Sequence, residues 1–451
     1  MTLQREHMSS VDTAWLRMES PVSRMTIGVV LIFEDPLALP LLLDVLQERL
    51  LKFDRFRQKV IRHEIRSWWE EDPQFSIYNH VKTVELDDAD SKECLQDIAG
   101  MLMNTTLDFK HPLWQIHHIE KFQSGSALII RIHHCIADGM SLVRLLLSLT
   151  DAEADPASIA LTSDKPTAGA GSRHHEGMWD VLTHPAHLKK LAKDGVSAIA
   201  ELARVTLGAN DPASLLKGTI SGVKKVAWAE PFALGDVKRI GKKLNATVND
   251  ILVAAVAGAL RQYFLRTICE AELHGMHVLI PFNLRPIDAP MESLGNQFGM
   301  VLLPLPIQVA DPLDRLQHAK AAMDQLKHSY QAHVFYGMLE FFGKGPAVVE
   351  QTALDILSRK ASAVMTNVPG PKRPVYLAGA KLKQPLVWVP QAGNVGIGMA
   401  ILTYNDIVQF GFVADVALIP DPNEIADLFI AQFRILEMLS DEQMHIAPVP
   451  H

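Results

Sequence analysis

The sequence is poor in cysteine. Its 451 residues include three cysteines, Cys94, Cys135 and Cys269, which are widely separated and form no CxxC pair. Three isolated cysteines exclude a disulfide framework, and we expect the protein to work in a reducing compartment.

Long apolar runs are also lacking. The first twenty residues contain no apolar core of the roughly 7–15 residues that a secretory signal requires. The longest clean apolar run, residues 251–260, is far shorter than the ~20 residues that span a bilayer. We therefore expect the protein to meet a membrane, if at all, only from its surface.

There is no excess of positive charge. The chain has 43 Lys and Arg against 51 Asp and Glu, a formal charge of −8, which makes it a poor candidate for a general nucleic-acid binder. The hydrophobic fraction of 48 % and the charged fraction of 21 % are typical of soluble globular proteins and exclude wholesale disorder. At ~100–200 residues per domain, the length predicts two or three domains.

Strand and helix patterns alternate in both halves of the chain, which predicts an α/β or α+β fold in two domains. The clearest patterns are a buried strand at 25–33, a hairpin with strands at 114–122 and 127–134, a helix at 248–264, a strand at 277–284, a helix-rich stretch at 312–360, and a hairpin with Asn405 and Asp406 at its tip. Residues 155–177 are rich in Pro, Gly, Ala and Ser and indicate a flexible linker. We expect an N-terminal domain at 1–154, a linker and helical crossover at 155–223, and a C-terminal domain at 224–451.

The richest polar cluster is the segment 131–139, RIHHCIADG, where an apolar strand ends and a helix begins. Neighbouring strand residues point to opposite faces, so only one of His133 and His134 can enter a cleft, and the other serves as a brace. A purely structural alternative stays open, in which both histidines are buried and hydrogen-bonded and Asp138 caps the next helix.

Two other kinds of chemistry fit this segment poorly. Cys135 could be a nucleophile paired with a histidine, but it lies on the strand face opposite His134. A metal site would need convergent ligands, and adjacent strand histidines diverge, while the helical HExxH spacing is absent. We expect neither a nucleophilic cysteine nor a metal.

Four motifs together resemble one known family. HHCIADG matches the HHxxxDG motif of the CoA-dependent acyltransferase superfamily, which includes chloramphenicol acetyltransferases and condensation domains. The segments PLW at 112–114, ND at 249–250 and TNVPGP at 366–371, with the opening DTAWLRMES and PFNLRP at 281–286, resemble the bacterial wax ester synthase/acyl-CoA:diacylglycerol acyltransferases over essentially the whole chain. Thr366 stands where serine is commoner.

The resemblance implies a two-domain chloramphenicol-acetyltransferase-like fold, each domain a mixed sheet flanked by helices, with a tunnel between the domains. It implies transfer of a long-chain acyl group from acyl-CoA to a fatty alcohol or diacylglycerol, without an acyl-enzyme, a metal or a cofactor besides acyl-CoA as co-substrate. His134 would be the general base and then the acid, a task for which an unperturbed pKa of ~6.5 suits histidine. His133 would be a brace, Asp138 would pair with Arg285, and Gly139 would permit a sharp turn.

Further positions have a functional and a structural interpretation. Asn249 could donate to the oxyanion or order the site, beside Asp250 in a capping box with Thr247. Substrate contact is expected from the PLW and TNVPGP segments, although a strand entry, a core tryptophan and a turn would explain them too; the residues concerned are Pro112, Trp114, Thr366, Asn367, Pro369 and Gly370.

A cluster of positive charge precedes Asn249. It consists of Lys238, Arg239, Lys242 and Lys243. These side chains could meet the phosphates of CoA or an anionic membrane surface, or they could form a solvated helix face. We expect a cytoplasmic enzyme attached peripherally to the inner membrane face or to lipid inclusions. Two rival functions stay open: an acyltransferase for a smaller or carrier-bound acceptor, and a catalytically idle lipid-binding protein.

Overall fold

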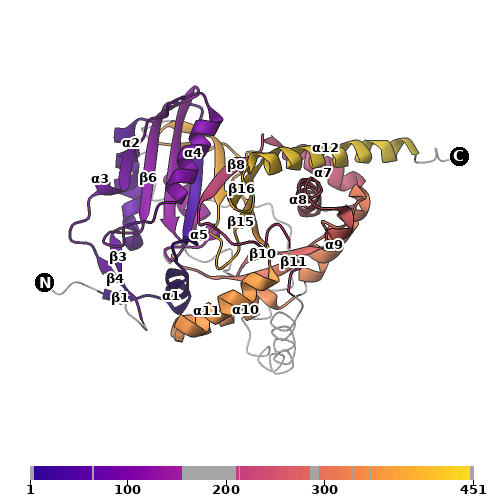
Figure 1. Cartoon of the computed structure of the whole chain (residues 1–451). Helices are drawn as coiled ribbons and strands as arrows, with labels where there is room; N and C mark the ends of the chain where they lie inside the picture. The colour runs from indigo at the N-terminus through magenta and orange to yellow at the C-terminus, as the bar shows by residue number, and fades with distance from the viewer. Residues whose placement is uncertain are drawn as a thin grey trace, which may run out of the picture.

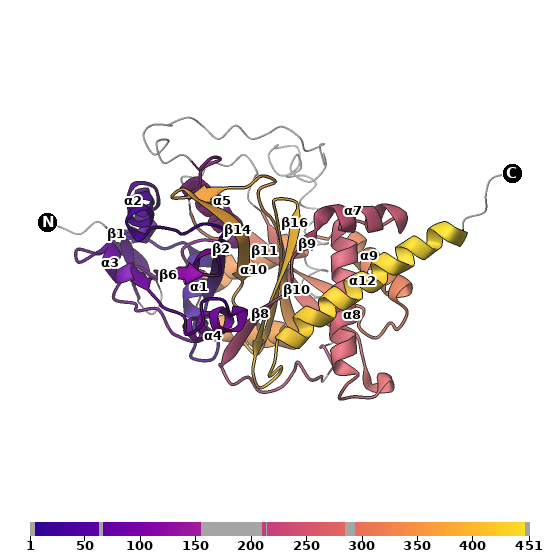
Figure 2. The ribbon, with the colours of Figure 1, turned by 90° about the horizontal axis from the view of Figure 1, so that it is seen from above.

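The computed structural model describes residues 5–62, 66–154, 210–212, 214–284, 294–327, 329–345 and 347–446. These residues form two lobes, each a mixed β-sheet flanked by helices (Figure 1). The N-terminal lobe lies on one side of the molecule, and helices α7 (Leu234–Lys243), α8 (Val248–Phe264) and α12 (Asn423–Ile446) lie on the other. The end of α12 projects beyond the body of the molecule (Figure 2).

The N-terminal sheet is built around two buried strands, β2 (Thr26–Phe33) and β7 (Gly125–His133), in the order β13-β14-β2-β7-β6-β5. The other strands are β5 (Val81–Thr83), β6 (Trp114–Phe122), β13 (Tyr376–Leu377) and β14 (Ala380–Trp388). Alternate residues of β2 serve different cores. Ile27, Val29 and Leu31 pack toward α2 (Leu39–Arg49) and α5 (Gly139–Leu149), whereas Val30 and Ile32 pack toward α4 (Lys92–Met103).

The C-terminal sheet has the order β11-β10-β12-β15-β16-β8, with β9 (Phe232–Ala233) beside β16. Its strands are β8 (Lys224–Trp228), β10 (Met276–Asn283), β11 (Phe298–Leu305), β12 (Ala363–Pro369), β15 (Ile397–Tyr404) and β16 (Ile407–Asp415). Helices α8, α12 and α9 (Pro312–Lys327) pack together over it. Helix α10 (Gln331–Lys344) packs on β11 and on α1 (Ser10–Arg17), and α11 (Ala347–Lys360) follows α10.

Several predicted elements are confirmed. The helix at 248–264 is α8, and it begins with the predicted capping box, in which Thr247 and Asp250 exchange hydrogen bonds of 2.8 and 3.2 Å. The second predicted hairpin is β15–β16, and Asn405 and Asp406 at its tip have φ values of 48° and 56°. Both are therefore in the left-handed region that a two-residue hairpin turn requires, which asparagine and aspartate tolerate.

The predicted division at residue 224 is wrong in one respect. Strands β13 and β14 come from the C-terminal part of the chain but belong to the N-terminal sheet, where β14 pairs antiparallel with β2. Strand β7 occupies the other side of β2, so β14 supplies the hydrogen-bond partners that would otherwise be missing along that edge. The predicted linker at 155–177, and the crossover up to residue 209, lie outside the described residues.

A small three-stranded sheet lies at the edge of the N-terminal lobe. Its strands are β1 (Arg5–His7), β4 (Trp68–Glu71) and β3 (Gln58–Ile61), in that order.

Within the described ranges, no single helix is long and apolar enough to cross a membrane. Helices α7 and α8 meet that length and composition only as a pair that is bent by 96°.

Candidate active site

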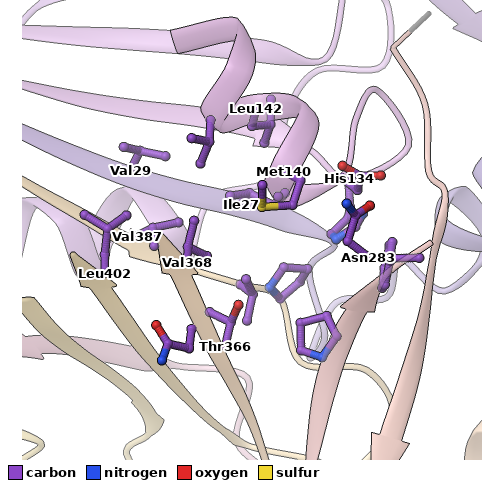
Figure 3. A pocket seen from close by; sticks show the side chains of 18 of the residues that line it. Ile27, Val29, His134, Met140, Leu142, Asn283, Thr366, Val368, Val387 and Leu402 are labelled. Atoms are coloured by element: carbon purple, nitrogen blue, oxygen red, sulfur yellow. The ribbon is translucent and has the colours of Figure 1, made fainter. Parts of the chain in front are cut away.

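An apolar cavity of about 310 Å³ lies between the lobes. Its walls come from β2 and β14 of the N-terminal sheet, from helix α5, and from β10, β11, β12 and β15 of the C-terminal sheet. Figure 3 shows His134 and Asn283 at one end of the cavity, and Val29 and Leu402 toward the other. The cavity therefore has His134 and Asn283 at one end, and its other walls are mostly apolar, apart from Thr366 and Asn367 on β12.

A second cavity of about 80 Å³ continues the apolar space. It shares lining residues with the first, namely Leu31, Val143, Leu146, Pro385 and Leu402. Because Leu402 lies at the apolar end in Figure 3, the continuation runs away from His134. An extended hydrocarbon chain with its head at His134 would find apolar walls along its length.

His134 follows the last residue of β7 and lines the larger cavity. Its backbone N–H donates to the carbonyl of Met25 at 2.7 Å. Its ring stacks on Trp15 with a centroid distance of 4.1 Å and an interplanar angle of 16°, and Phe298 lies 5.4 Å away. Burial lowers the pKa of His134 to about 4, although Asp138 opposes the shift, so the imidazole is neutral at pH 7 and its lone pair can accept a proton.

Two residues outside the sequence-predicted site hold the His134 backbone. The Asn296 Nδ2 group donates to the His134 carbonyl at 2.7 Å and to Asp12 Oδ1 at 2.7 Å. Asp12 lies on α1, and burial raises the pKa of its carboxyl to about 6. Asp12 and Trp15 both belong to the DTAWLRMES segment, and their place in that family motif was the available signal, since an aspartate on a short helix usually faces solvent.

His133 points away from the cavity, as the strand periodicity predicts. Its Nδ1 accepts the backbone N–H of Cys135 at 3.1 Å, and its Nε2 lies 3.5 Å from Glu19 Oε2. The His133 ring meets Phe109 edge-on. Cys135 is fully buried, does not line the cavity, and has a thiol pKa well above its usual value because of burial. These contacts fit a brace at His133 and an inert thiol at Cys135.

Asp138 is the N-cap of α5, as the structural alternative predicts. Its Oδ1 accepts the backbone N–H of Ser141 at 2.7 Å, and its Oδ2 accepts that of Gln297 at 3.0 Å. The carboxylate thus ties the helix after His134 to the segment that carries Asn296. Arg285 lies outside the described residues, so its pairing with Asp138 stays a prediction.

The reason expected for Gly139 is wrong. Gly139 is not among the residues with positive φ, so its backbone conformation does not require glycine. A Cβ built there would meet no atom within 4 Å, and Gly139 lines the cavity. The missing side chain therefore leaves room beside His134.

The TNVPGP segment forms part of β12 and the turn after it. Thr366, Asn367 and Pro369 line the larger cavity, and Gly370 lines the smaller one. Asn367 Nδ2 donates to Asn249 Oδ1 at 2.7 Å. Asn249 itself does not line the cavity, so its contact supports an ordering role through Asn367 and not a direct donor to the oxyanion.

The expected substrate contact of Pro112 and Trp114 is wrong, because neither residue lines either cavity. Trp114 is buried in the N-terminal core, where its Nε1–H donates to the carbonyl of Phe56 at 2.9 Å. It also stacks on His80 with centroids 4.4 Å apart. The PLW segment therefore anchors the start of β6.

The predicted positive cluster lies on α7, and α12 neutralises half of it. Arg239 lies 2.7 Å from Glu437, and Lys243 lies 2.7 Å from Asp441. Lys238 and Lys242 are exposed. None of the four lines either cavity, so a contact with CoA phosphates is not supported by their position. Across the described part of the chain, no group of three or more His, Cys, Asp or Glu side chains could hold a metal ion.

The fold and the site together define a two-domain protein of the HHxxxDG type, in which a strand-end histidine faces a cavity between the domains. The first condensation domain of the CDA synthetase has this fold, with a TM-score of 0.62 and 14 % identity over 97 % of this chain and 96 % of that one. A mutant starter condensation domain of the rhizomide synthetase RzmA, in complex with C8-CoA, gives a TM-score of 0.61 at 13 % identity, over 97 % and 95 % of the two chains.

Matches to two family models identify the family to which the chain belongs. The wax ester synthase/diacylglycerol acyltransferase catalytic domain matches residues 8–252, and the WS/DGAT C-terminal domain matches residues 294–437. The chain therefore belongs to the wax ester synthase/diacylglycerol acyltransferase family.

Proteins of this family resemble the chain over most of its length. The "probable diacylglycerol O-acyltransferase tgs1" of Mycobacterium tuberculosis is 27 % identical over 93 % of each chain. Wax ester synthase/diacylglycerol acyltransferase 2 of Arabidopsis thaliana is 27 % identical over 82 % of each. The structure of the Marinobacter aquaeolei VT8 wax ester synthase/diacylglycerol acyltransferase has a TM-score of 0.70 at 21 % identity and covers 96 % of this chain and 99 % of that one.

Proposed function

We propose that this protein transfers a long-chain acyl group from acyl-CoA to a fatty alcohol or diacylglycerol, with His134 as the proton carrier. One observation carries the proposal: a buried, neutral imidazole stands at the polar end of an apolar cavity between the lobes. Family membership supports the acyl transfer, and the apolar walls support long hydrocarbon substrates.

The reaction needs one proton acceptor and one proton donor. His134 accepts the hydroxyl proton while the acceptor oxygen attacks the thioester carbonyl carbon. The tetrahedral intermediate collapses with cleavage of the C–S bond, and the His134 imidazolium returns the proton to the departing thiolate. The products are the ester and free CoA. No acyl-enzyme, metal or further cofactor enters this sequence.

The surroundings of His134 favour this chemistry over hydrolysis. The imidazole is enclosed by Trp15 and Phe298, and the neighbouring walls are apolar. An acceptor whose hydrocarbon chain fills the cavity displaces the water that would otherwise attack the thioester. A fatty alcohol or diacylglycerol satisfies this requirement, whereas a small polar acceptor leaves the apolar space unfilled.

Product analysis tests the proposal. Purified protein is incubated with palmitoyl-CoA and hexadecanol, dioleoylglycerol or ethanol, and both thiol release and ester formation are measured. We expect ester from the long acceptors and none from the His134→Ala variant, which should still fold. Absence of ester with every acceptor would contradict transferase activity, and ester from ethanol alone would favour the small-acceptor function.

We also propose that the protein works at the surface of the inner membrane or of lipid inclusions, since its substrates partition there. Lys238 and Lys242 are exposed on α7, whereas Arg239 is paired with Glu437 and Lys243 with Asp441. Replacing Lys238 and Lys242 with Gln should weaken binding to anionic vesicles by roughly fivefold per lysine. Lys243→Gln is the matched control. Equal sedimentation of all three proteins with vesicles would contradict the role of this helix face.

A further inference from the structure

Asn296 lies at the junction of three segments that are remote in the sequence. It precedes β11, its backbone N–H donates to Asp12 Oδ1 at 3.1 Å, and its side-chain Nδ2 donates to both Asp12 and the His134 carbonyl. Asn296, Asp12 and His134 are 6 %, 6 % and 5 % exposed. Water therefore does not compete for these hydrogen bonds.

The orientation of the Asn296 amide follows from its neighbours. Two acceptors, the Asp12 carboxylate and the His134 carbonyl, surround one end of the amide, so that end must be the NH₂ group, which has two protons to donate. The reversed amide would place its oxygen against two other oxygens. Asp12 thereby fixes the direction in which Asn296 Oδ1 points.

Three buried polar atoms around this contact have no hydrogen-bond partner in the described structure. They are Asn296 Oδ1, an acceptor, His134 Nδ1, which is either a donor or an acceptor, and Trp15 Nε1, a donor on the ring that stacks on His134. A buried polar group without a partner is costly, and the Asn296 side chain interacts with the His134 ring, so a hydrogen bond between Asn296 Oδ1 and His134 Nδ1 is favourable. It also requires the proton of the neutral imidazole to be on Nδ1.

We propose that Asn296, held by Asp12, is a positioning residue that fixes both the ring orientation and the tautomer of His134. With the proton on Nδ1, the lone pair of Nε2 is the one available to the acceptor hydroxyl. Trp15, one helical turn after Asp12, stacks on the same ring. Helix α1 thus orients His134 in two ways, by hydrogen bonds through Asn296 and by direct ring stacking. This role rests on the proposed function of His134 as the proton carrier.

The first test is kinetic. Asn296→Ala should lower kcat by roughly 10- to 100-fold, the penalty for a misplaced catalytic group, with the KM for palmitoyl-CoA unchanged. Asp12→Ala should do the same, whereas Asp12→Asn, which retains an acceptor oxygen, should restore most of kcat. Asp415→Ala is the matched control, since it removes a buried carboxylate that accepts hydrogen bonds from Ser221 and Gly222, far from His134. It should lower stability but not kcat.

The second test needs no turnover. In histidine labelled with nitrogen-15, the His134 signals, assigned by their loss in His134→Ala, should show the proton on Nδ1 in the parent protein and in Asp12→Asn. In Asn296→Ala the two tautomers should be mixed. If Asn296→Ala does not fold, Asp12→Ala and Asp12→Asn make the same comparison.

The outcomes separate this inference from the function on which it rests. If the parent protein forms no ester, the proposed function fails. If the parent protein is active, His134→Ala is inactive, and Asn296→Ala and Asp12→Ala keep both kcat and the tautomer, then the function stands and the role of Asn296 is overturned.

Discussion

His134 is a neutral base because its surroundings penalise the imidazolium. Trp15 and Phe298 flank the ring, and burial outweighs the favourable charge of Asp138. The same enclosure keeps the lone pair free of competing water. The apolar packing around His134 therefore also keeps the imidazole neutral and able to accept the hydroxyl proton.

This environment predicts a particular pH dependence of activity. Because the pKa of His134 is lowered from 6.5 to about 4, the acid limb of kcat/KM should fall near pH 4 and not near pH 6.5. Asp12 is protonated below about pH 6, but its protonated carboxyl still accepts a hydrogen bond. Asp12→Asn should therefore leave the limb in place. An acid limb of kcat/KM centred at pH 6.5 would contradict the expectation that burial lowers the pKa of His134.

The same shift affects stability, with a defined sign. Between pH 6.5 and about 4 the unfolded chain protonates His134 while the folded protein does not, so the contribution of His134 to folding free energy is lost as pH falls through that window. Asp12 acts in the opposite direction, since its raised pKa favours the folded state at low pH. Urea unfolding of the parent protein and of His134→Gln measures the contribution of His134. Between pH 7 and pH 5 the variant should lose less stability than the parent protein.

The sequence was sufficient to separate His134 from His133 because strand residues alternate between faces. It was insufficient to find Asn296, because its partners lie 284 and 162 residues away. Nothing in the local pattern around Asn296 indicates that long-range contact. Asp12 is a similar case, as a lone aspartate on a short helix usually faces solvent.

Among the secondary-structure elements, α5 matters most to the site, because it begins beside His134. Asp138 caps it and also receives the Gln297 N–H from the other lobe. The Ser141 bond is buried and the Gln297 bond is partly buried, and both the cap and this contact between the lobes depend on one carboxylate.

Asp138→Ala should therefore cost more than loss of an ordinary cap. We expect about 0.5–2 kcal/mol for the cap and a further ~0.5–1.5 kcal/mol for the hydrogen bond that the partly buried Gln297 N–H loses. Asp138→Ser keeps an oxygen that can accept the Ser141 N–H, but its side chain is too short to reach Gln297 as well. Its stability should therefore lie between the stabilities of Asp138→Ala and of the parent protein. Thermal unfolding measures the series. Equal melting temperatures for Asp138→Ser and the parent protein would show that the second bond contributes nothing.

The sequence predicted the elements whose turn or cap residues lie within the element itself. It did not predict elements whose place depends on a strand that is distant in the sequence. The β15–β16 hairpin is specified by Asn405 and Asp406, and α8 by its capping box, both of which act within a few residues. Strand β14 interrupts its apolar pattern with lysines and contains Pro385, which usually argues against a strand. Its place in the sheet depends on β2, which is distant in the sequence.

At the scale of the whole molecule, β14 joins the two lobes. It pairs with β2 in one sheet and packs against β15 and β16 of the other. Trp388 illustrates the connection, since its Nε1–H donates to the Phe412 carbonyl at 3.2 Å and its ring lies 6.0 Å from that of Trp228. The lobes therefore share a core as well as a cavity.

This shared core predicts cooperative unfolding. Trp388→Ala should destabilise the protein by about 3–5 kcal/mol, as expected for a buried tryptophan. Both lobes should still unfold in one transition, because β14 belongs to the N-terminal sheet and packs against β15 and β16 of the other. Hydrogen exchange of β7 and of β16 in increasing urea reports on each lobe separately. Separate transitions for the two strands in the parent protein would contradict the coupling.

The position of β14 in the chain also has a consequence for biosynthesis. One side of β2 is unpaired until residues 380–388 have emerged from the ribosome, although β2 itself emerges near the start of translation. For most of synthesis the nascent N-terminal lobe therefore presents a long apolar strand edge, the kind of surface that templates aggregation. A ribosome that stalls before residue 380 would release a chain that cannot complete its first sheet, and such chains should depend on chaperones or be degraded.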